Sequence, residues 1–235
     1  MKHIFFDLDR TLWDFEKNSE QALRLLFDDL SLGNHMRDFD TFFNSYKKIN
    51  ARLWNSYGAG KITKDVLRIK RFEDTLKSFQ VDDALMAQNL AEGYVSISPR
   101  QTNIFPNTHE TLQELKKDGK ELHIITNGFK EVQFIKLENC GLRDYFDVII
   151  CSEDVGKNKP APEIFQHTMK LANAKPEDSV MIGDDLKVDV RGAERQGMTG
   201  VLFDPNRDYN ERAHEWRIHD LSRLPEIIPF MRKPL

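Results

Sequence analysis

From Pro106 onward, short apolar runs alternate with segments of helical periodicity, and this alternation constrains the possible folds more than any other feature. Strands separated by segments of helical length are joined by crossovers, which favours a mostly parallel sheet. The apolar runs are nearly continuous, as expected for strands covered by helices on both faces. The expected strands are residues 121–128, 147–151, 179–184 and 199–203, and the expected helices are 107–119 (capped by Asn107 or Thr108), 130–141, 162–174 and 185–197.

The chain begins with one more strand of the same kind, at residues 3–7. A long segment follows in which apolar residues recur at helical spacing and no strand pattern occurs, so we expect it to be all-helical. The sequence therefore predicts an α/β fold, with a doubly wound, mostly parallel, Rossmann-type sheet and a helical domain inserted after the first strand. The predicted domains are 1–13 with 100–235 for the α/β core, and 14–99 for the helical insertion.

Charge and composition exclude several classes of partner. The 235 residues carry a net charge of −4 with acids and bases interspersed, so the concentrated basic face that nucleic acid polymers require is not expected. No apolar run is long enough to cross a bilayer, and two aspartates interrupt the N-terminal apolar stretch before a signal-peptide core could form. Cys140 and Cys151 are expected to be reduced thiols, with one disulfide as the alternative. We therefore expect a cytoplasmic protein without membrane partners, either a monomer or a dimer.

Polar side chains gather where the predicted strands end. Ligands of open α/β sheets bind outside the carboxyl ends of the strands, so these positions are candidates for a site. Asp7 and Asp9, two apart on an extended chain, are expected to point to the same side and to form an acidic cluster with Asp184. Such a cluster needs a cation, and hard carboxylate oxygens without histidine or cysteine favour Mg²⁺ over zinc. The other candidates at this edge are Thr126, Asn127, Lys159 and Asp185.

Four short motifs in this order resemble those of the haloacid dehalogenase superfamily. "DLDRT" at residues 7–11 is similar to its first motif, "ITNG" at 125–128 to its second, Lys159-Pro160 to its third and "IGDDLKVD" at 182–189 to its fourth. The resemblance covers essentially the whole chain, and the helical insertion lies where this superfamily places a small mobile cap domain. Softer similarity, in "LWNSYGAGKIT", "ITNGF" and "LENCGLRDYFD", points to the branch of noncanonical pyrimidine 5′-nucleotidases.

The resemblance implies a role for each candidate residue. Asp7 would attack phosphorus and Asp9 would act as the acid and base, while Lys159 would stabilise the transferring phosphoryl group. Thr126 and the backbone N–H of Asn127 would hold the phosphate oxygens. Magnesium would be bound by Asp7, the backbone carbonyl of Asp9, and Asp184. Asp185 and Asp189 would lie behind these ligands, unless Asp185 only caps the following helix.

The expected function is therefore Mg²⁺-dependent hydrolysis of a small phosphate monoester, most specifically a pyrimidine nucleoside 5′-monophosphate. A sugar phosphate or a phosphoglycolate-like acid is the alternative substrate. A 2-haloacid dehalogenase is disfavoured because a halide needs no proton from Asp9, and a non-catalytic phosphate-binding module is disfavoured because every catalytic residue is present. Arg10 departs from the first motif and leaves the substrate range open. His3 and His123 are expected to be structural.

Overall fold

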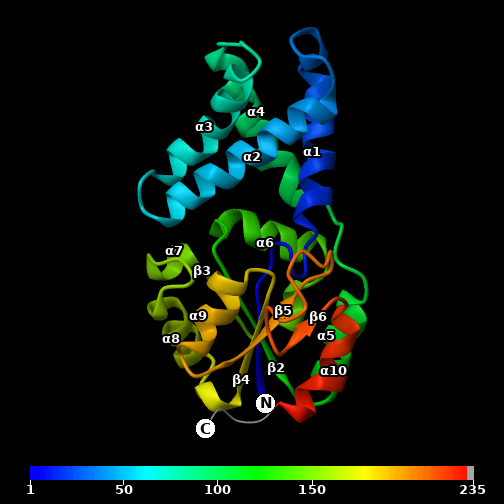
Figure 1. Ribbon diagram of the computed structural model, residues 1–235, viewed down its shortest axis with the longest axis vertical. Coiled ribbons are helices and arrows are strands. Elements are labelled where there is room, and N and C mark those ends of the chain that lie inside the picture. Colours follow the sequence, from blue (N-terminus) through cyan, green and yellow to red (C-terminus); the bar gives the residue numbers. More distant parts are fainter. Residues whose placement is uncertain (232–235) are drawn as a thin grey trace. The chain divides into compact units, whose positions relative to one another are not determined.

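The computed structural model describes residues 1–231, which divide into two compact units (Figure 1). The first unit comprises Met1–Phe15 and the chain from Thr102 onward, and the second comprises Glu16–Gln101. Both boundaries of the second unit lie two residues later in the chain than the predicted limits of 14 and 99. That the first unit is a catalytic core and the second a cap domain stays a prediction.

A six-stranded, fully parallel sheet forms the centre of the first unit, which confirms the predicted fold class. The spatial order is β3-β2-β1-β4-β5-β6, so the first strand lies in the middle of the sheet with β2 and β4 as its neighbours. The last strand has two residues and was not predicted, because so short a run carries no periodicity. The strands are β1 (His3–Phe6), β2 (Glu121–Thr126), β3 (Val148–Cys151), β4 (Ser179–Gly183), β5 (Thr199–Phe203) and β6 (Arg217–Ile218).

Helices cover both faces of this sheet because its strands are apolar on both sides. Ile4 and Phe6 of β1 belong to one buried cluster, with side chains from α5 (Thr108–Lys117), α6 (Lys130–Asn139) and α10 (Leu224–Ile227). Phe5, between them, belongs to the opposite cluster, together with α8 (Pro162–Leu171) and α9 (Arg191–Glu194). Figure 1 shows α5 and α10 on one side of the sheet and α8 and α9 on the other. Successive side chains of the strand point to opposite faces of the sheet, so β1 contributes to two separate hydrophobic cores.

Two details of the predicted helices are wrong. The helix after Pro106 begins at Thr108 as expected, but Asn107 does not cap it: its backbone is left-handed (φ 62°) and its amide donates to the Asp220 carboxylate at 2.9 Å. Thr108 does not cap it either, because its hydroxyl donates to the Phe105 carbonyl. The expected helix at 185–197 opens with a wider π turn, Leu186–Val190, before α9 begins. Single π turns of this kind often occur at functional sites.

The second unit is helical throughout, as predicted, and no strand lies among residues 16–101. Three of its four helices begin with a side chain that accepts a backbone N–H: Asp38 caps α2, Thr63 caps α3 and Asp83 caps α4. Such caps satisfy donors that the first helical turn leaves without a partner. The helices of this unit are α1 (Phe15–Asp29), α2 (Phe39–Gly58), α3 (Lys64–Lys77) and α4 (Ala84–Ile97). The first unit contains one further short helix, α7 (Ser152–Val155).

Aromatic rings fill the centre of the helical unit. Phe72 of α3 is fully buried, with its ring centroid 5.4 Å from Tyr46 of α2 and 5.7 Å from Tyr94 of α4. The Tyr94 hydroxyl, buried with the rings, donates to Ser19 of α1 at 2.9 Å. These contacts join all four helices, so this unit has a core independent of the sheet.

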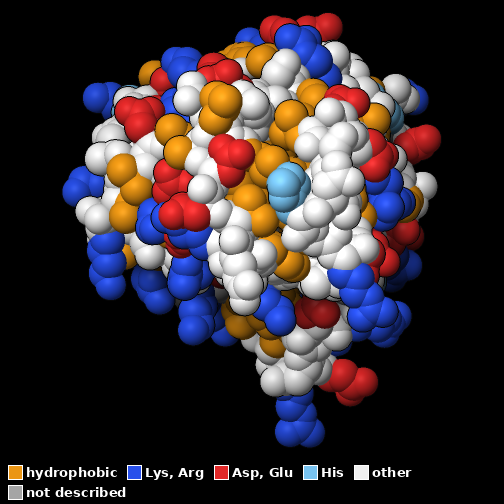
Figure 2. Space-filling model, turned by 90° about the horizontal axis from the view of Figure 1, so that it is seen from above, with side chains coloured by type: hydrophobic (Ala, Val, Ile, Leu, Met, Phe, Trp, Pro, Cys, Tyr) orange, Lys and Arg blue, Asp and Glu red, His pale blue; other side chains and the backbone are white. Residues whose placement is uncertain are grey.

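Among residues 1–231, no helix is both long and apolar enough to span a bilayer. Acidic and basic side chains are interspersed on the face shown in Figure 2.

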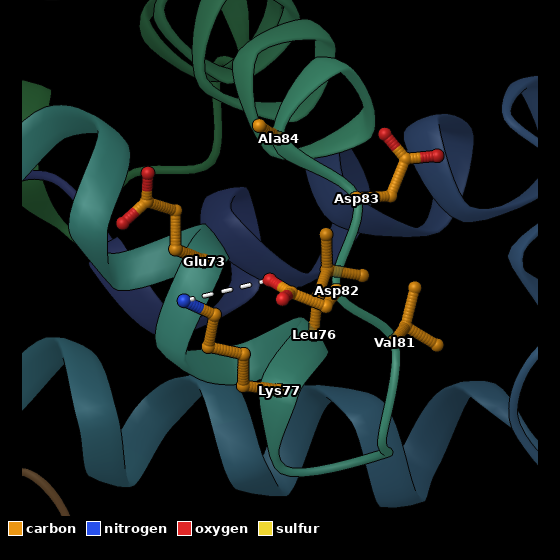
Figure 3. A pocket seen from close by; sticks show the side chains of 7 residues that line it. All are labelled: Glu73, Leu76, Lys77, Val81, Asp82, Asp83 and Ala84. Carbon is orange, nitrogen blue, oxygen red and sulfur yellow. Dashed lines mark ion pairs between the residues drawn. The ribbon is translucent and has the colours of Figure 1, made fainter.

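One pocket lies where α3 ends and α4 begins, with an ion pair between Lys77 and Asp82 at 3.5 Å (Figure 3). Three of its seven lining residues are acidic, which does not suit a phosphorylated ligand: Glu73, Leu76, Lys77, Val81, Asp82, Asp83 and Ala84.

Because Phe72 is buried between the rings of Tyr46 and Tyr94, replacing it by alanine leaves a cavity there. This substitution should destabilise the helical unit by about 3–5 kcal/mol. Urea unfolding followed by circular dichroism measures this loss. Val66→Ala on the same helix is the matched control, since Val66 is 43% exposed and should change the free energy of unfolding by no more than about 0.5 kcal/mol. Equal effects of the two substitutions would contradict the aromatic core.

Candidate active site

Three neighbouring strands bring the predicted site residues to one edge of the sheet. β1 lies between β2 and β4 and runs parallel to both, so the ends of these strands meet. The backbone N–H of Asp7 donates to Ile182 of β4 at 2.9 Å, which extends the pairing of β1 and β4 up to the first aspartate. Asp7, Thr126 and Asp184 thus follow or end three adjacent strands, at the point where the order of the strands along the chain reverses.

A cluster of three carboxylates lies at this edge. Oxygen atoms of Asp7, Asp184 and Asp189 lie within 4.8 Å of one another. Asp189 reaches the cluster because Gly183 at the end of β4 has no side chain: a Cβ there would lie 2.4 Å from the Asp189 carboxylate. The sequence placed Asp189 behind the ligands, whereas the structure brings its carboxylate into the cluster itself.

The Lys159 side chain is buried among these acids, with 4% of the residue exposed. Its Nζ lies 2.6 Å from Oδ1 of Asp7 and 2.7 Å from Oδ1 of Asp189. Asn127 holds the lysine backbone in place: its Oδ1 accepts the Lys159 N–H at 2.7 Å, and its amide donates to the Lys159 carbonyl at 3.1 Å. The second and third motifs are therefore linked by the side chain of one and the main chain of the other.

Burial shifts the pKa of every acid in this cluster upward. It raises the pKa of Asp7 to about 7, although Lys159 opposes the shift, and raises the pKa of Asp184 to about 8, with Asp189 and Asp7 as the next causes. The pKa of Asp189 is raised by the same burial. For Lys159, burial alone would lower the pKa of the ammonium, but the charges of Asp189 and Asp7 outweigh it and raise that pKa. The lysine is therefore a fixed cation.

The donor set fits a hard divalent cation. Three carboxylates face one ammonium, so ionising all three leaves net negative charge in a buried place, which is costly without a further cation. Carboxylate oxygens are the ligands preferred by Mg²⁺. No histidine or cysteine belongs to this cluster.

The carboxylate of Asp9 does not join the cluster, contrary to the expectation from its spacing. The chain leaves the extended conformation directly after β1, because the N–H groups of Leu12 and Trp13 turn back to the Leu8 carbonyl. Asp9 instead contacts α6: its Oδ1 lies 2.5 Å from Nζ of Lys136, and its Oδ2 accepts from Gln133 at 2.9 Å.

Gln133 and Lys136 are site residues that the sequence did not reveal. Both are buried on α6, the helix that follows the second motif. Gln133 joins two predicted residues, since its amide also donates to the Thr126 hydroxyl at 2.6 Å. The only available signal was their spacing of three residues, which places an amide and an amine on the same helix face, but the same spacing occurs on many solvated helices.

The remaining predicted residues have well-defined places. Oδ1 of Asp185 accepts the backbone N–H groups of Lys187 and Val188, so this side chain caps the π turn. Arg10 has a left-handed backbone (φ 65°) and its guanidinium lies 4.4 Å from the ring centre of Phe15. Burial raises the pKa of Asp184, and the charge of Arg10 offsets only part of that rise. Cys140 and Cys151 are buried and are not joined in a disulfide.

Comparison with known proteins identifies the family. A profile of the haloacid dehalogenase-like hydrolases matches residues 1–197. The chain belongs to the haloacid dehalogenase-like hydrolases. It is 32% identical to the pyrimidine 5′-nucleotidase YjjG of Escherichia coli, over 96% of each chain. It is 30% identical to a ribulose-1,5-bisphosphate 5-phosphatase of Halopiger xanaduensis, over 96% of this chain and 98% of that one.

A solved structure of the same family shows a related fold. The magnesium-bound crystal structure of the HAD-hydrolase YfnB from Bacillus subtilis matches 97% of this chain and 98% of its own, with a TM-score of 0.86 and 28% identity. The haloacid dehalogenase-like hydrolase described here thus shares its fold with a relative that binds magnesium.

The raised pKa values predict how stability depends on pH when no metal is bound. An acid whose pKa is higher in the folded state than its unfolded value of about 3.9 stabilises the fold at low pH, and this contribution is lost as the pH rises through the folded value. For Asp7 and Asp184 the loss is complete above about pH 7–8. Urea unfolding in EDTA should therefore show lower stability at pH 8 than at pH 5.

Asp184→Asn should reduce that fall in stability, since it removes one of the buried charges, whereas the exposed substitution Asp82→Asn should leave it unchanged. Added Mg²⁺ should restore the stability of the unaltered protein at pH 8 and have less effect on Asp184→Asn. If the pH dependence were the same in all three proteins, the acid cluster would not be its source.

Proposed function

We propose that this chain is a Mg²⁺-dependent phosphatase that hydrolyses small phosphate monoesters through a phosphorylated Asp7. The observation that carries the proposal is the separation of two carboxylates only two residues apart. Asp7 lies against the buried ammonium of Lys159 at 2.6 Å, while Asp9 is held apart from it by Lys136 and Gln133. One carboxylate can thus act as a nucleophile while the other handles protons.

The residues divide the reaction into two steps. In the first, a carboxylate oxygen of Asp7 forms a bond to phosphorus, the ester bond breaks, and the leaving alkoxide takes a proton from Asp9. In the second, Asp9 takes a proton from water, the water oxygen attacks phosphorus, and the bond between Asp7 and phosphorus breaks. Magnesium held by Asp7, Asp184 and the backbone carbonyl of Asp9 would supply positive charge for the phosphoryl oxygens. Lys159 supplies a further positive charge that does not titrate in the working range.

Thr126 is suited to hold a phosphate oxygen. Its hydroxyl oxygen already accepts two hydrogen bonds, from the Gly128 N–H at 3.1 Å and from Gln133 at 2.6 Å. A hydroxyl has two acceptor lone pairs and one donor, so its hydrogen is left to donate to a ligand. The backbone N–H of Asn127 is the second group assigned to the phosphate.

Two substrate classes are supported by the relatives. The similarity to YjjG, together with "ITNGF" and "LENCGLRDYFD", favours pyrimidine nucleoside 5′-monophosphates. The relatives from Halopiger xanaduensis and Pyrococcus furiosus, each 30% identical, are phosphatases of ribulose-1,5-bisphosphate and glyceraldehyde 3-phosphate, so a sugar phosphate is the second candidate. A dehalogenase is disfavoured by Asp9, because a halide leaves without a proton.

Phosphate release from a panel of monoesters tests the chemistry and the substrate class together. We expect turnover with Mg²⁺, highest on uridine and thymidine 5′-monophosphates, and loss of activity in EDTA. Preference for sugar phosphates would keep the mechanism and replace the substrate. Asp7→Asn should lower kcat to the background of the assay, and substantial remaining turnover would rule out the phosphoenzyme.

The role of Asp9 predicts a dependence on the leaving group. Asp9→Asn should lower kcat on a nucleoside monophosphate by about 10²–10⁴-fold, the usual contribution of a general acid or base. For a nitrophenyl phosphate, whose leaving group needs no proton, formation of the phosphoenzyme should be affected much less, and a rapid-mixing burst of nitrophenolate measures it. Equal losses of this first step on both substrates would assign Asp9 a structural role instead.

A further inference from the structure

A second group of metal-ligating side chains lies at the other end of the strands from Asp7. His3 is the first residue of β1, Glu121 is the first residue of β2, and His123 lies two positions further along β2. His3 pairs with Glu121 in the parallel register, and residues two apart on a strand share a face. All three side chains therefore lie on one face of the sheet. Figure 1 marks the N-terminus of the chain, where β1 begins.

The donor atoms of these side chains converge. Nδ1 of His3 lies 3.2 Å from Nε2 of His123 and 3.4 Å from Oε2 of Glu121, and all three atoms lie within 4.8 Å of one another. In a tetrahedral zinc site, bonds of about 2.0–2.1 Å place the ligand atoms about 3.3–3.4 Å apart. The two measured separations match this spacing.

Hydrogen bonding among the three side chains does not fully explain why their donor atoms converge. Burial lowers the pKa of both histidines, that of His123 to about 4, so both rings are neutral and each carries one N–H. If Nδ1 of His3 carries its proton, that single proton is shared between two acceptors, Nε2 of His123 and Oε2 of Glu121. If Nδ1 of His3 is unprotonated, its lone pair faces the Glu121 carboxylate. A cation would attract all three lone pairs together.

Lys2 orients the third ligand. Its Nζ lies 2.6 Å from Oε1 of Glu121, which leaves Oε2 turned toward His3. Contacts that fix a ligand from behind in this way are usual in metal sites. The Glu121 side chain is 38% exposed while both histidines are buried, so an ion could enter from the carboxylate side.

We propose that His3, Glu121 and His123 form a second metal site, which takes a transition-metal ion of the Zn²⁺ class and leaves the fourth position to water. Two imidazoles and one carboxylate suit Zn²⁺, whereas the all-carboxylate cluster at the catalytic edge suits Mg²⁺. The site joins the starts of β1 and β2 at the end of the sheet remote from the reacting groups. An ion there would bind the folded state and stabilise it without taking part in phosphoryl transfer.

Cobalt binding to the full, tag-free protein tests the site, because tetrahedral Co²⁺ absorbs visible light far more strongly than octahedral Co²⁺. In excess Mg²⁺, we expect one Co²⁺ per chain with a strong tetrahedral spectrum, displaced by Zn²⁺, and a higher Tm with Zn²⁺ bound. Asp184→Asn, which alters only the catalytic cluster, should keep the spectrum. His123→Gln should abolish it and weaken binding at least tenfold, and so should Glu121→Gln, which leaves both buried histidines in place and serves if His123→Gln does not fold.

In Mg²⁺ and without Zn²⁺ or Co²⁺, the phosphatase activity of Glu121→Gln should equal that of the unaltered protein. This result would separate the proposed site from the catalytic one. The proposal is overturned if no tetrahedral spectrum appears, or if Co²⁺ binding is lost in Asp184→Asn and kept in Glu121→Gln. The second result would place the ion in the acid cluster.

Discussion

The ion pairs of Lys159 are the interactions on which the candidate active site depends. This buried ammonium lies between Asp7 and Asp189, and without it three carboxylates would be left in a place that water barely reaches. Removing one partner of a buried pair costs far more than removing an exposed one, because the remaining charge stays desolvated. The lysine lies in the loop between α7 and α8, the first aspartate directly follows β1, and the last lies in the turn after β4, so one side chain joins three parts of the chain. Asn127 fixes the lysine main chain, which adds β2 to the same assembly.

The sheet order explains why these groups can meet at all. Placing β1 in the centre sets the ends of β2 and β4 on either side of Asp7, and parallel strands direct all their carboxyl ends to one edge. Gly183 and the π turn after it then bring Asp189 back over the end of β4. The same parallel arrangement also aligns the opposite ends of the strands, which is how His3 comes to face Glu121 and His123. One topology thus gathers polar groups at both ends of a sheet whose middle is apolar.

Two carboxylates that are near neighbours in sequence have different surroundings. Asp7 contacts the buried Lys159, whereas Asp9 contacts Lys136 and the amide of Gln133. A nucleophile and a proton-transfer group need such separate positions, because one acts on phosphorus and the other on the leaving oxygen. The turn after Leu8, with Arg10 in a left-handed conformation, produces the separation. The helical unit has its own aromatic core, so its fold does not depend on these polar contacts.

The sequence by itself determined the fold class, the order of the first five strands with the main helices between them, and the family. Periodicity and apolar runs are local properties, and four motifs in order specify the superfamily without reference to packing. It also named Asp7, Thr126, Lys159 and Asp184, because residues that follow parallel strands must meet at one edge. Only the tertiary structure decided which way each side chain turns. Asp9 leaves the acidic cluster and Asp189 enters it, Gln133 and Lys136 appear beside Asp9, and Asn107 binds Asp220 instead of capping its helix. These outcomes depend on turns, on the absence of a Cβ at Gly183 and on partners that are distant in the sequence. A local sequence pattern therefore cannot predict them.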